Sequence, residues 1–218
     1  MRRLLRVGVL VSGRGSNLQA ILDAIDGGRL DAEVAVVIAN ALGCPALEKA
    51  SSAGVPTECV TSRSAGGRKE QLLEIHRALL RHAVDVVVLA GFNLILDPET
   101  TSEFKNRIVN IHPSLLPAFA GGMAPQPQAD AVEYGVKVSG CTVHLVTDDL
   151  DGGAIVAQVA VPVRFEDTAE TLADRILQEE HKILPEVLQW MAEDRVRVFG
   201  RRVQVLPEGV GDGPDGGV

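Results

Sequence analysis

The feature that most restricts the fold is a buried strand followed at once by a glycine-rich turn and a helix. Residues Leu5–Val11 form an apolar run with the length and composition of a parallel strand covered on both faces. The sequence Ser-Gly-Arg-Gly-Ser-Asn follows at residues 12–17, and helical spacing then runs from Leu18 to Leu22. Amides at the start of a helix bind anions, and glycine lets a phosphate approach the backbone. We therefore predict an α/β fold with a phosphate site at residues 12–17, although the spacing matches neither the Walker pattern nor Gly-x-Gly-x-x-Gly.

Strands and helices continue to alternate along the chain. Further strands are predicted over residues 31–39, 55–60, 84–90, 107–112, 139–147 and 154–163, and helices over residues 45–53, 67–82, 129–134 and 168–191. This order is typical of a doubly wound, mostly parallel sheet in a single domain, which we place at residues 1–205. Pro185 predicts a kink or break in the last helix, and a strand pair is expected around Gly200. The glycine-, proline- and acid-rich residues 206–218 predict a flexible tail.

Composition and charge exclude several functional classes. Hydrophobic residues make up 46% of the 218 residues but aromatic residues only 3%, so aliphatic side chains must fill the core. No apolar run approaches the roughly 18 residues that span a membrane, and the start resembles no signal peptide. The net charge of −8 argues against nucleic acid as a partner, and three widely spaced cysteines fit reduced thiols without a metal site. We therefore expect a cytoplasmic protein with small-molecule partners, as a monomer or weak homodimer.

The decapeptide Asn110–Phe119 places two polar side chains at the end of a short strand. Alternate residues of a strand share a face, so Asn110 and His112 point the same way while Ile111 enters the core. Pro113 cannot continue the ladder and ends the strand at His112. Open α/β sheets build their sites at the carboxyl ends of strands, which favours a functional site here. The alternative is a turn-capping Asn110 and a structural His112.

A second polar segment follows the predicted strand 139–147. His144 shares a face with Thr142 and Val146, and taken alone it favours a structural role. Three aspartates stand within four residues at Asp148–Asp151, but the EF-hand spacing and its terminal glutamate are absent. The Asp-Gly-Gly end at residues 151–153 predicts a tight reversing loop, with Asp148 solvated before it.

These segments together resemble the formyltransferases that use 10-formyltetrahydrofolate. The matching motifs are Ser-Gly-x-Gly-Ser-Asn-Leu at residues 12–18, Ala-Gly-Phe at residues 90–92, the decapeptide, and Val-His-x-Val-Thr-x-x-Leu-Asp-Gly-Gly at residues 143–153. The resemblance extends from about Val7 to about His181. It implies a Rossmann-like formyltransferase fold, with residues 1–100 as the phosphate-binding half and residues 101–205 as the folate-binding and catalytic half. Members that formylate glycinamide ribonucleotide in purine biosynthesis are the most similar.

The resemblance also implies roles for individual residues. Catalysis would fall to Asn110, His112 and Asp151. The ribonucleotide would be bound by Gly15, Ser16, Asn17 and Glu180. The folate, as formyl donor, would be bound by Arg68, Asn93, Leu94, Ile95, Leu96 and Asn110. No metal is implied. Without the resemblance, Arg68 and Glu180 would be interpreted as exposed helix charges.

The chain departs from the family pattern at two places. Members commonly have Met-Arg where this chain has Asn93-Leu94, so any role of that arginine is lost or supplied elsewhere. The loop at residues 120–128 lacks the usual histidine and arginine and is longer, and its glycines and prolines predict a flexible segment over Gly121–Gln128 near the folate pocket.

Three alternative functions remain at this stage. One is hydrolysis of 10-formyltetrahydrofolate, but hydrolases usually carry a regulatory domain ahead of the catalytic one, which we do not expect here. Another is formylation of an aminoacyl-tRNA, which would require a further basic domain and agrees poorly with the acidic charge. The third is a nonenzymatic nucleotide-sensing module, which the joint matches at Asn110, His112, Asp151 and Glu180 argue against.

Overall fold

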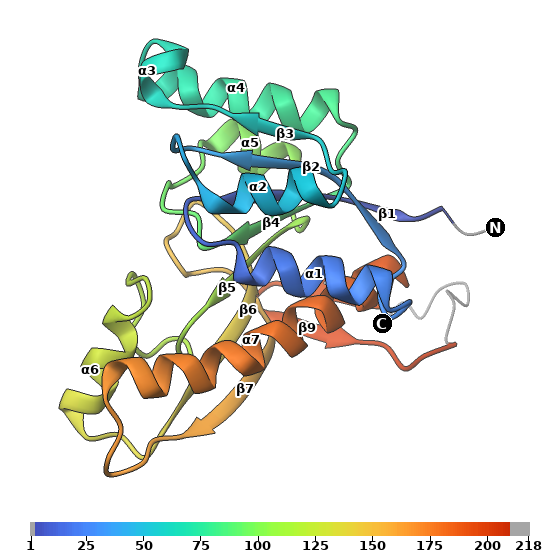
Figure 1. The fold of residues 1–218 in the computed structure, drawn as a ribbon. Helices are drawn as coiled ribbons and strands as arrows, with labels where there is room; N and C mark the ends of the chain where they lie inside the picture. Colours follow the sequence, from blue (N-terminus) through green and yellow to red (C-terminus); the bar gives the residue numbers. More distant parts are fainter. Residues whose placement is uncertain (1–2, 210–218) are drawn as a thin grey trace.

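A twisted seven-stranded sheet forms the centre of the protein in the computed structural model, which describes residues 3–209 (Figure 1). The strand order is β3-β2-β1-β4-β5-β6-β7. The strands are β1 (Leu5–Val11), β2 (Ala32–Ala39), β3 (Thr57–Cys59), β4 (Val86–Ala90), β5 (Ile108–His112), β6 (Val138–Leu145) and β7 (Ile155–Pro162). Strands β1 to β5 pair in parallel, and β6 and β7 add antiparallel strands at one edge. The predicted doubly wound, mostly parallel sheet is therefore confirmed.

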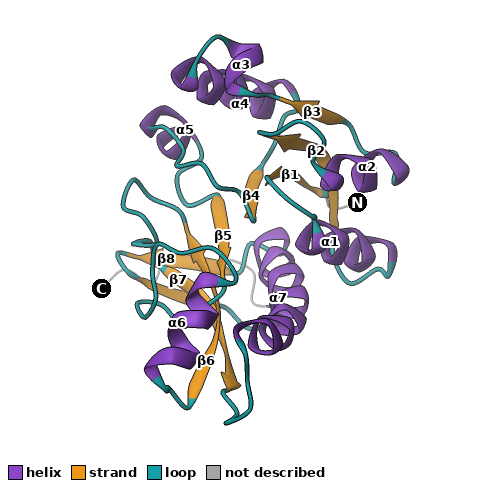
Figure 2. Ribbon diagram, turned by 60° about the vertical axis from the view of Figure 1, so that its left-hand side comes forward, coloured by secondary structure: helices purple, strands orange, loops and turns teal. Residues whose placement is uncertain are grey.

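Helices cover both faces of the sheet (Figure 2). They are α1 (Ser16–Asp26), α2 (Pro45–Ser52), α3 (Ser62–Ala65), α4 (Arg68–Arg81), α5 (Pro98–Glu103), α6 (Gln126–Tyr134) and α7 (Ala169–Ala192). Side chains of β1 alternate between the two layers, so that Val7 and Val9 join the core beneath α1 and α7 while Leu10 joins the core beneath α4. Among residues 3–209, no helix has the length and apolarity needed to cross a membrane.

The strand order reverses direction between β1 and β4. Chain connections leave these two strands toward opposite sides, which opens a crevice at their carboxyl ends and provides the usual ligand site of a doubly wound sheet. Strand β5 ends beside the same crevice, because it pairs in parallel with β4. The C-terminal strands β8 (Val196–Phe199) and β9 (Arg202–Val205) form the expected hairpin as a separate two-stranded sheet.

Several sequence predictions require correction. Helix α6 begins at Gln126, so the end of the segment predicted to be a flexible loop is helical, with Pro127 in the first turn, where proline is tolerated. Pro185 does not end α7, which runs on to Ala192 and is 24 residues long in all, because buried neighbours such as Leu184 and Leu188 hold it against the sheet. The short helix α3 was not predicted, although Thr61 and Ser64 cap each other there. Most of the predicted flexible tail lies outside the described residues.

Candidate active site

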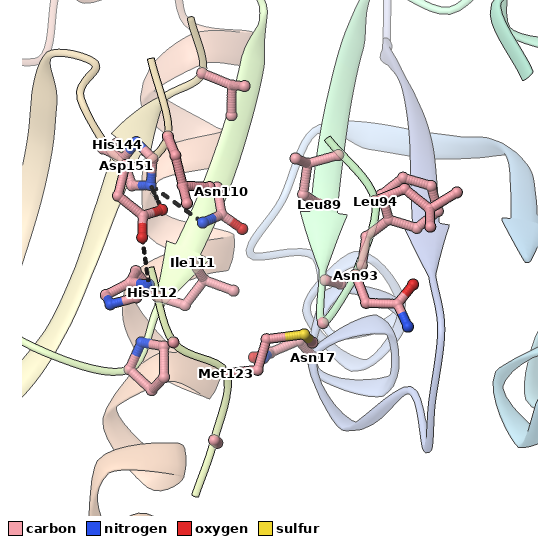
Figure 3. Close-up of a pocket in the computed structure, with 18 of the residues that line it drawn as sticks. Asn17, Leu89, Asn93, Leu94, Asn110, Ile111, His112, Met123, His144 and Asp151 are labelled. Carbon is pink, nitrogen blue, oxygen red and sulfur yellow. Dashed lines mark hydrogen bonds and ion pairs between the residues drawn. The ribbon is translucent and has the colours of Figure 1, made fainter. Parts of the chain in front are cut away.

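A cavity of about 520 Å³ occupies the crevice at the carboxyl ends of β1, β4 and β5. Figure 3 shows Asn110, His112, His144 and Asp151 along one wall, and Leu89, Asn93 and Leu94 along the opposite wall. The first turn of α1 and Glu180 of α7 complete the lining. Segments distant in sequence therefore meet here, because the parallel strands all deliver their carboxyl ends to one edge of the sheet.

Asn110, His112, His144 and Asp151 form a connected polar cluster. Asp151 Oδ2 lies 3.3 Å from His112 Nδ1, and Asp151 Oδ1 lies 3.5 Å from His144 Nε2. Asn110 Nδ2 lies 3.1 Å from His144 Nε2, since the two residues are directly opposite in the antiparallel pair of β5 and β6. The structure thus brings together the three residues predicted to be catalytic. It adds His144, which sequence reasoning had favoured as a structural residue.

The protonation of His112 follows from its two neighbours. Its Nε2 lies 3.0 Å from the Phe119 carbonyl oxygen, which can only accept, so in the neutral ring Nε2 carries the hydrogen. Nδ1 is then the basic nitrogen, and it faces Asp151. Burial lowers the pKa of His112 below its usual value, and the nearby Asp151 carboxylate only partly opposes this effect. His112 is therefore a neutral base beside a carboxylate that stabilises its protonated form.

Asp151 remains ionised although its side chain is buried. Burial raises its pKa, but hydrogen bonding to His144 and to the Gly121 amide, together with the positive charge that His112 carries when protonated, lowers the pKa overall. The Gly121 N–H donates to Oδ2 at 2.7 Å. The loop after β5 therefore contributes to both members of the pair, through Phe119 to His112 and through Gly121 to Asp151.

The opposite end of the cavity is built by the start of α1 and by α7. Gly15 precedes the helix with φ of 69°, a left-handed conformation, and a Cβ there would lie 2.6 Å from Ala46 Cβ. Asn17 Nδ2 donates to Glu180 Oε2 at 2.8 Å, and the buried Asn17 Oδ1 has no hydrogen-bond partner within residues 3–209. Glu180 is only 6% exposed and burial raises its pKa, so it is not a solvated helix charge. The predicted phosphate turn and Glu180 therefore share one site.

The wall formed by residues 93–96 combines apolar side chains with a polar anchor. Leu94, Ile95 and Leu96 line the cavity. The Asn93 N–H donates to Ser12 Oγ at 3.0 Å, and Asn93 Oδ1 accepts from Ser12 Oγ at 3.0 Å and from Asn40 Nδ2 at 2.6 Å. The departure at Asn93 thus ties this wall to the ends of β1 and β2. Arg68 is exposed at the start of α4 and is not among the described residues that line the cavity, so its folate role stays a prediction.

The reversing loop at residues 147–153, here called the aspartate loop, has a contact at its first carboxylate that the sequence did not predict. Asp148 is exposed, as predicted, and Thr101 Oγ1 of α5 also donates to Asp148 Oδ1 at 2.6 Å. No local pattern around Thr101 indicated this contact, because it joins residues 47 positions apart. Within the described part of the chain, no group of three or more His, Cys, Asp or Glu side chains is arranged to hold a metal ion.

Comparison with known proteins identifies the family. The sequence profile described as "Formyl transferase" matches residues 5–188. The chain belongs to the formyl transferase family. Phosphoribosylglycinamide formyltransferase of Escherichia coli (strain K12) is 38% identical over 194 residues, which cover 89% of this formyl transferase and 90% of that protein.

Longer relatives and solved structures extend the comparison. The trifunctional purine biosynthetic protein adenosine-3 of Homo sapiens is 42% identical over 193 residues. The match covers 88% of this chain but only 19% of that longer protein. The crystal structure of glycinamide ribonucleotide transformylase 1 from Symbiobacterium toebii aligns with a TM-score of 0.90 at 45% identity, covering 95% of this chain and 96% of that one. A formyltetrahydrofolate deformylase from Pseudomonas syringae pv. tomato aligns with a TM-score of 0.86 at 30% identity, covering 94% of this chain and 66% of that one.

Proposed function

We propose that this protein transfers a formyl group from 10-formyltetrahydrofolate to the primary amine of glycinamide ribonucleotide. The observation that carries the proposal is the pairing of His112 with Asp151, beside Asn110, in a cavity whose other end holds the start of α1. The His112, Asp151 and Asn110 side chains suit acyl transfer, and the start of α1 suits phosphate binding. The names of the Escherichia coli and Symbiobacterium toebii relatives agree with formyl transfer to glycinamide ribonucleotide.

The reaction requires stabilisation of an oxyanion and movement of a proton. The amine nitrogen attacks the formyl carbon, and the carbonyl oxygen becomes an oxyanion in a tetrahedral intermediate. Asn110 Nδ2 carries two hydrogens and lies at the cavity wall (Figure 3), so it can donate to that oxygen. The amine proton passes to His112, whose cation Asp151 stabilises, and then to the folate nitrogen as its bond to the formyl carbon breaks. No covalent enzyme intermediate is required.

The two ends of the cavity would hold the two substrates. The ribonucleotide phosphate would bind the amides of Gly15, Ser16 and Asn17, where the helix dipole favours negative charge. Glu180 would accept hydrogen bonds from the ribose hydroxyls, and these would supply partners to a buried carboxylate otherwise bonded to Asn17. The folate would bind against Asn93–Leu96 through backbone groups and apolar contacts, with its formyl group directed at Asn110.

Hydrolysis of the donor is the second candidate, because the Pseudomonas syringae deformylase shares this fold. The decisive experiment incubates the protein with 10-formyltetrahydrofolate, with and without glycinamide ribonucleotide, and measures both formate and formylated ribonucleotide. Formylated ribonucleotide without release of formate supports the proposal. Formate released without the acceptor supports the hydrolase, and no turnover in either mixture refutes both. His112→Ala should lower kcat by about 10²- to 10⁴-fold, whereas Asp149→Asn, at an exposed residue of the aspartate loop, should retain turnover.

A further inference from the structure

Asp151 lies in a backbone conformation that its neighbours must maintain. Its φ is 51°, in the left-handed region that residues with a Cβ rarely adopt. The turn is closed by the Gly152 N–H, which donates to the Asp149 carbonyl at 3.0 Å. Such conformations persist where the surrounding structure over-determines them. The contacts that hold the aspartate loop from outside therefore decide whether the Asp151 carboxylate faces His112.

One of these contacts comes from the C-terminal hairpin. Arg201 lies in the turn between β8 and β9, and its Nη1 donates to the Gly152 carbonyl at 2.7 Å. The hairpin follows the family match, which ends at residue 188. It is held in place from β9, which packs against β7, the strand that leaves the aspartate loop. The guanidinium therefore reaches the peptide next to Asp151 from a fixed part of the fold.

A second contact holds the other end of the loop. Thr101 of α5 donates to Asp148, so the loop is fixed on both sides of Asp151 by side chains from two separate elements. Gly153 closes the loop against β6, because a Cβ there would overlap the Leu145 carbonyl. The Gly121 amide binds the Asp151 carboxylate itself but does not constrain the backbone of the loop.

We propose that Arg201 is a positioning residue that keeps the aspartate loop in the conformation in which Asp151 faces His112. The expected effect of Arg201 on kcat rests on the proposed formyl transfer. The effect of Arg201 on the conformation of the aspartate loop does not depend on that proposal. Arg201 touches neither the cavity nor the proposed reacting atoms among the described residues, and it acts through the Gly152 carbonyl. An arginine suits this role because a carbonyl oxygen only accepts, and the guanidinium donates without titrating.

The kinetic test compares Arg201→Ala with Arg202→Ala, which removes the same charge from the adjacent exposed residue. We expect Arg201→Ala to lower kcat by about tenfold, corresponding to about 1.4 kcal/mol, with little change in the KM for ribonucleotide. Arg202→Ala should match the wild type. Arg201→Lys keeps a charged donor and should recover at least half of the wild-type kcat. Equal kcat values for Arg201→Ala and Arg202→Ala would overturn the inference, as would a lysine variant as slow as the alanine variant.

An NMR titration of His112 tests the same inference without turnover. The Asp151 carboxylate raises the pKa of His112, so a displaced carboxylate should lower it. Arg201→Ala should therefore shift the His112 pKa downward, in the direction of an Asp151→Asn reference, while Arg202→Ala leaves it unchanged. A wild-type protein that transfers no formyl group would refute the proposed function, yet the titration would still decide the role of Arg201. An unchanged His112 pKa in folded Arg201→Ala would overturn that role.

Discussion

Replacing Asp151 by asparagine removes one negative charge beside His112 and preserves the shape of the side chain. The atoms concerned, Oδ2 and Nδ1, are 3.3 Å apart, and the two side chains are only 7% and 3% exposed. Two unit charges at this separation attract by about 5 kcal/mol at an effective dielectric of 20, and by about 1.3 kcal/mol in bulk water. The attraction acts only once His112 holds the proton, so it stabilises the transition state and not the resting enzyme. A loss of about 3 kcal/mol corresponds to a fall in kcat of about 10²-fold.

The assay is steady-state formation of formylated ribonucleotide by the wild type, Asp151→Asn, His112→Ala and the double variant. Because the carboxylate acts through the imidazole, the double variant should be scarcely slower than His112→Ala. Asp149→Asn is the matched control, since it removes the same charge from an exposed position of the same loop. The reasoning is refuted if the effects of the two substitutions multiply, or if Asp149→Asn slows kcat as much as Asp151→Asn.

Three further predictions follow from the same geometry. Gly15→Val should lower Tm, because valine in the left-handed region costs about 1–2 kcal/mol and its Cβ would meet Ala46. The same substitution should raise the KM for ribonucleotide more than the KM for folate, and equal changes in the two KM values would contradict the phosphate site. Burial raises the pKa of Glu180 in the folded state, so its carboxylate destabilises the fold at pH 7. Glu180→Gln should therefore raise Tm at pH 7, by about 2–4 °C for each kcal/mol added to the free energy of unfolding. This increase in Tm should vanish below the unfolded-state pKa of about 4.3, where the carboxyl group is protonated in both the folded and the unfolded state. An increase in Tm that does not depend on pH would contradict the prediction. In the pH profile of kcat/KM, the acid limb should report the pKa of His112, which lies below its usual 6.5. Asp151→Asn should move that limb to still lower pH, and a limb that stays in place would exclude His112 as the base.

Local patterns predicted the elements whose neighbours agree with their sequence. The strand at Leu5–Val11, the turn after it and the alternation at Asn110 and His112 are all formed as expected, because burial on the sheet and local preference favour the same conformation. Predictions failed where tertiary packing overrides local preference. The packed face of α7 carries the helix through Pro185, and α6 begins three residues earlier than the helix expected from Ala129.

The sequence by itself determined the doubly wound order, the glycine turn at the start of a helix, and the Asn110 and His112 pair, because each depends on residues close together in the chain. The tertiary structure alone decided which distant side chains meet. His144 joins the site because antiparallel register places it opposite Asn110. Glu180 meets Asn17 across 163 residues, and Arg201 reaches the Gly152 carbonyl from the C-terminal hairpin. Such contacts depend on the packing of separate elements, and no spacing within one segment encodes them.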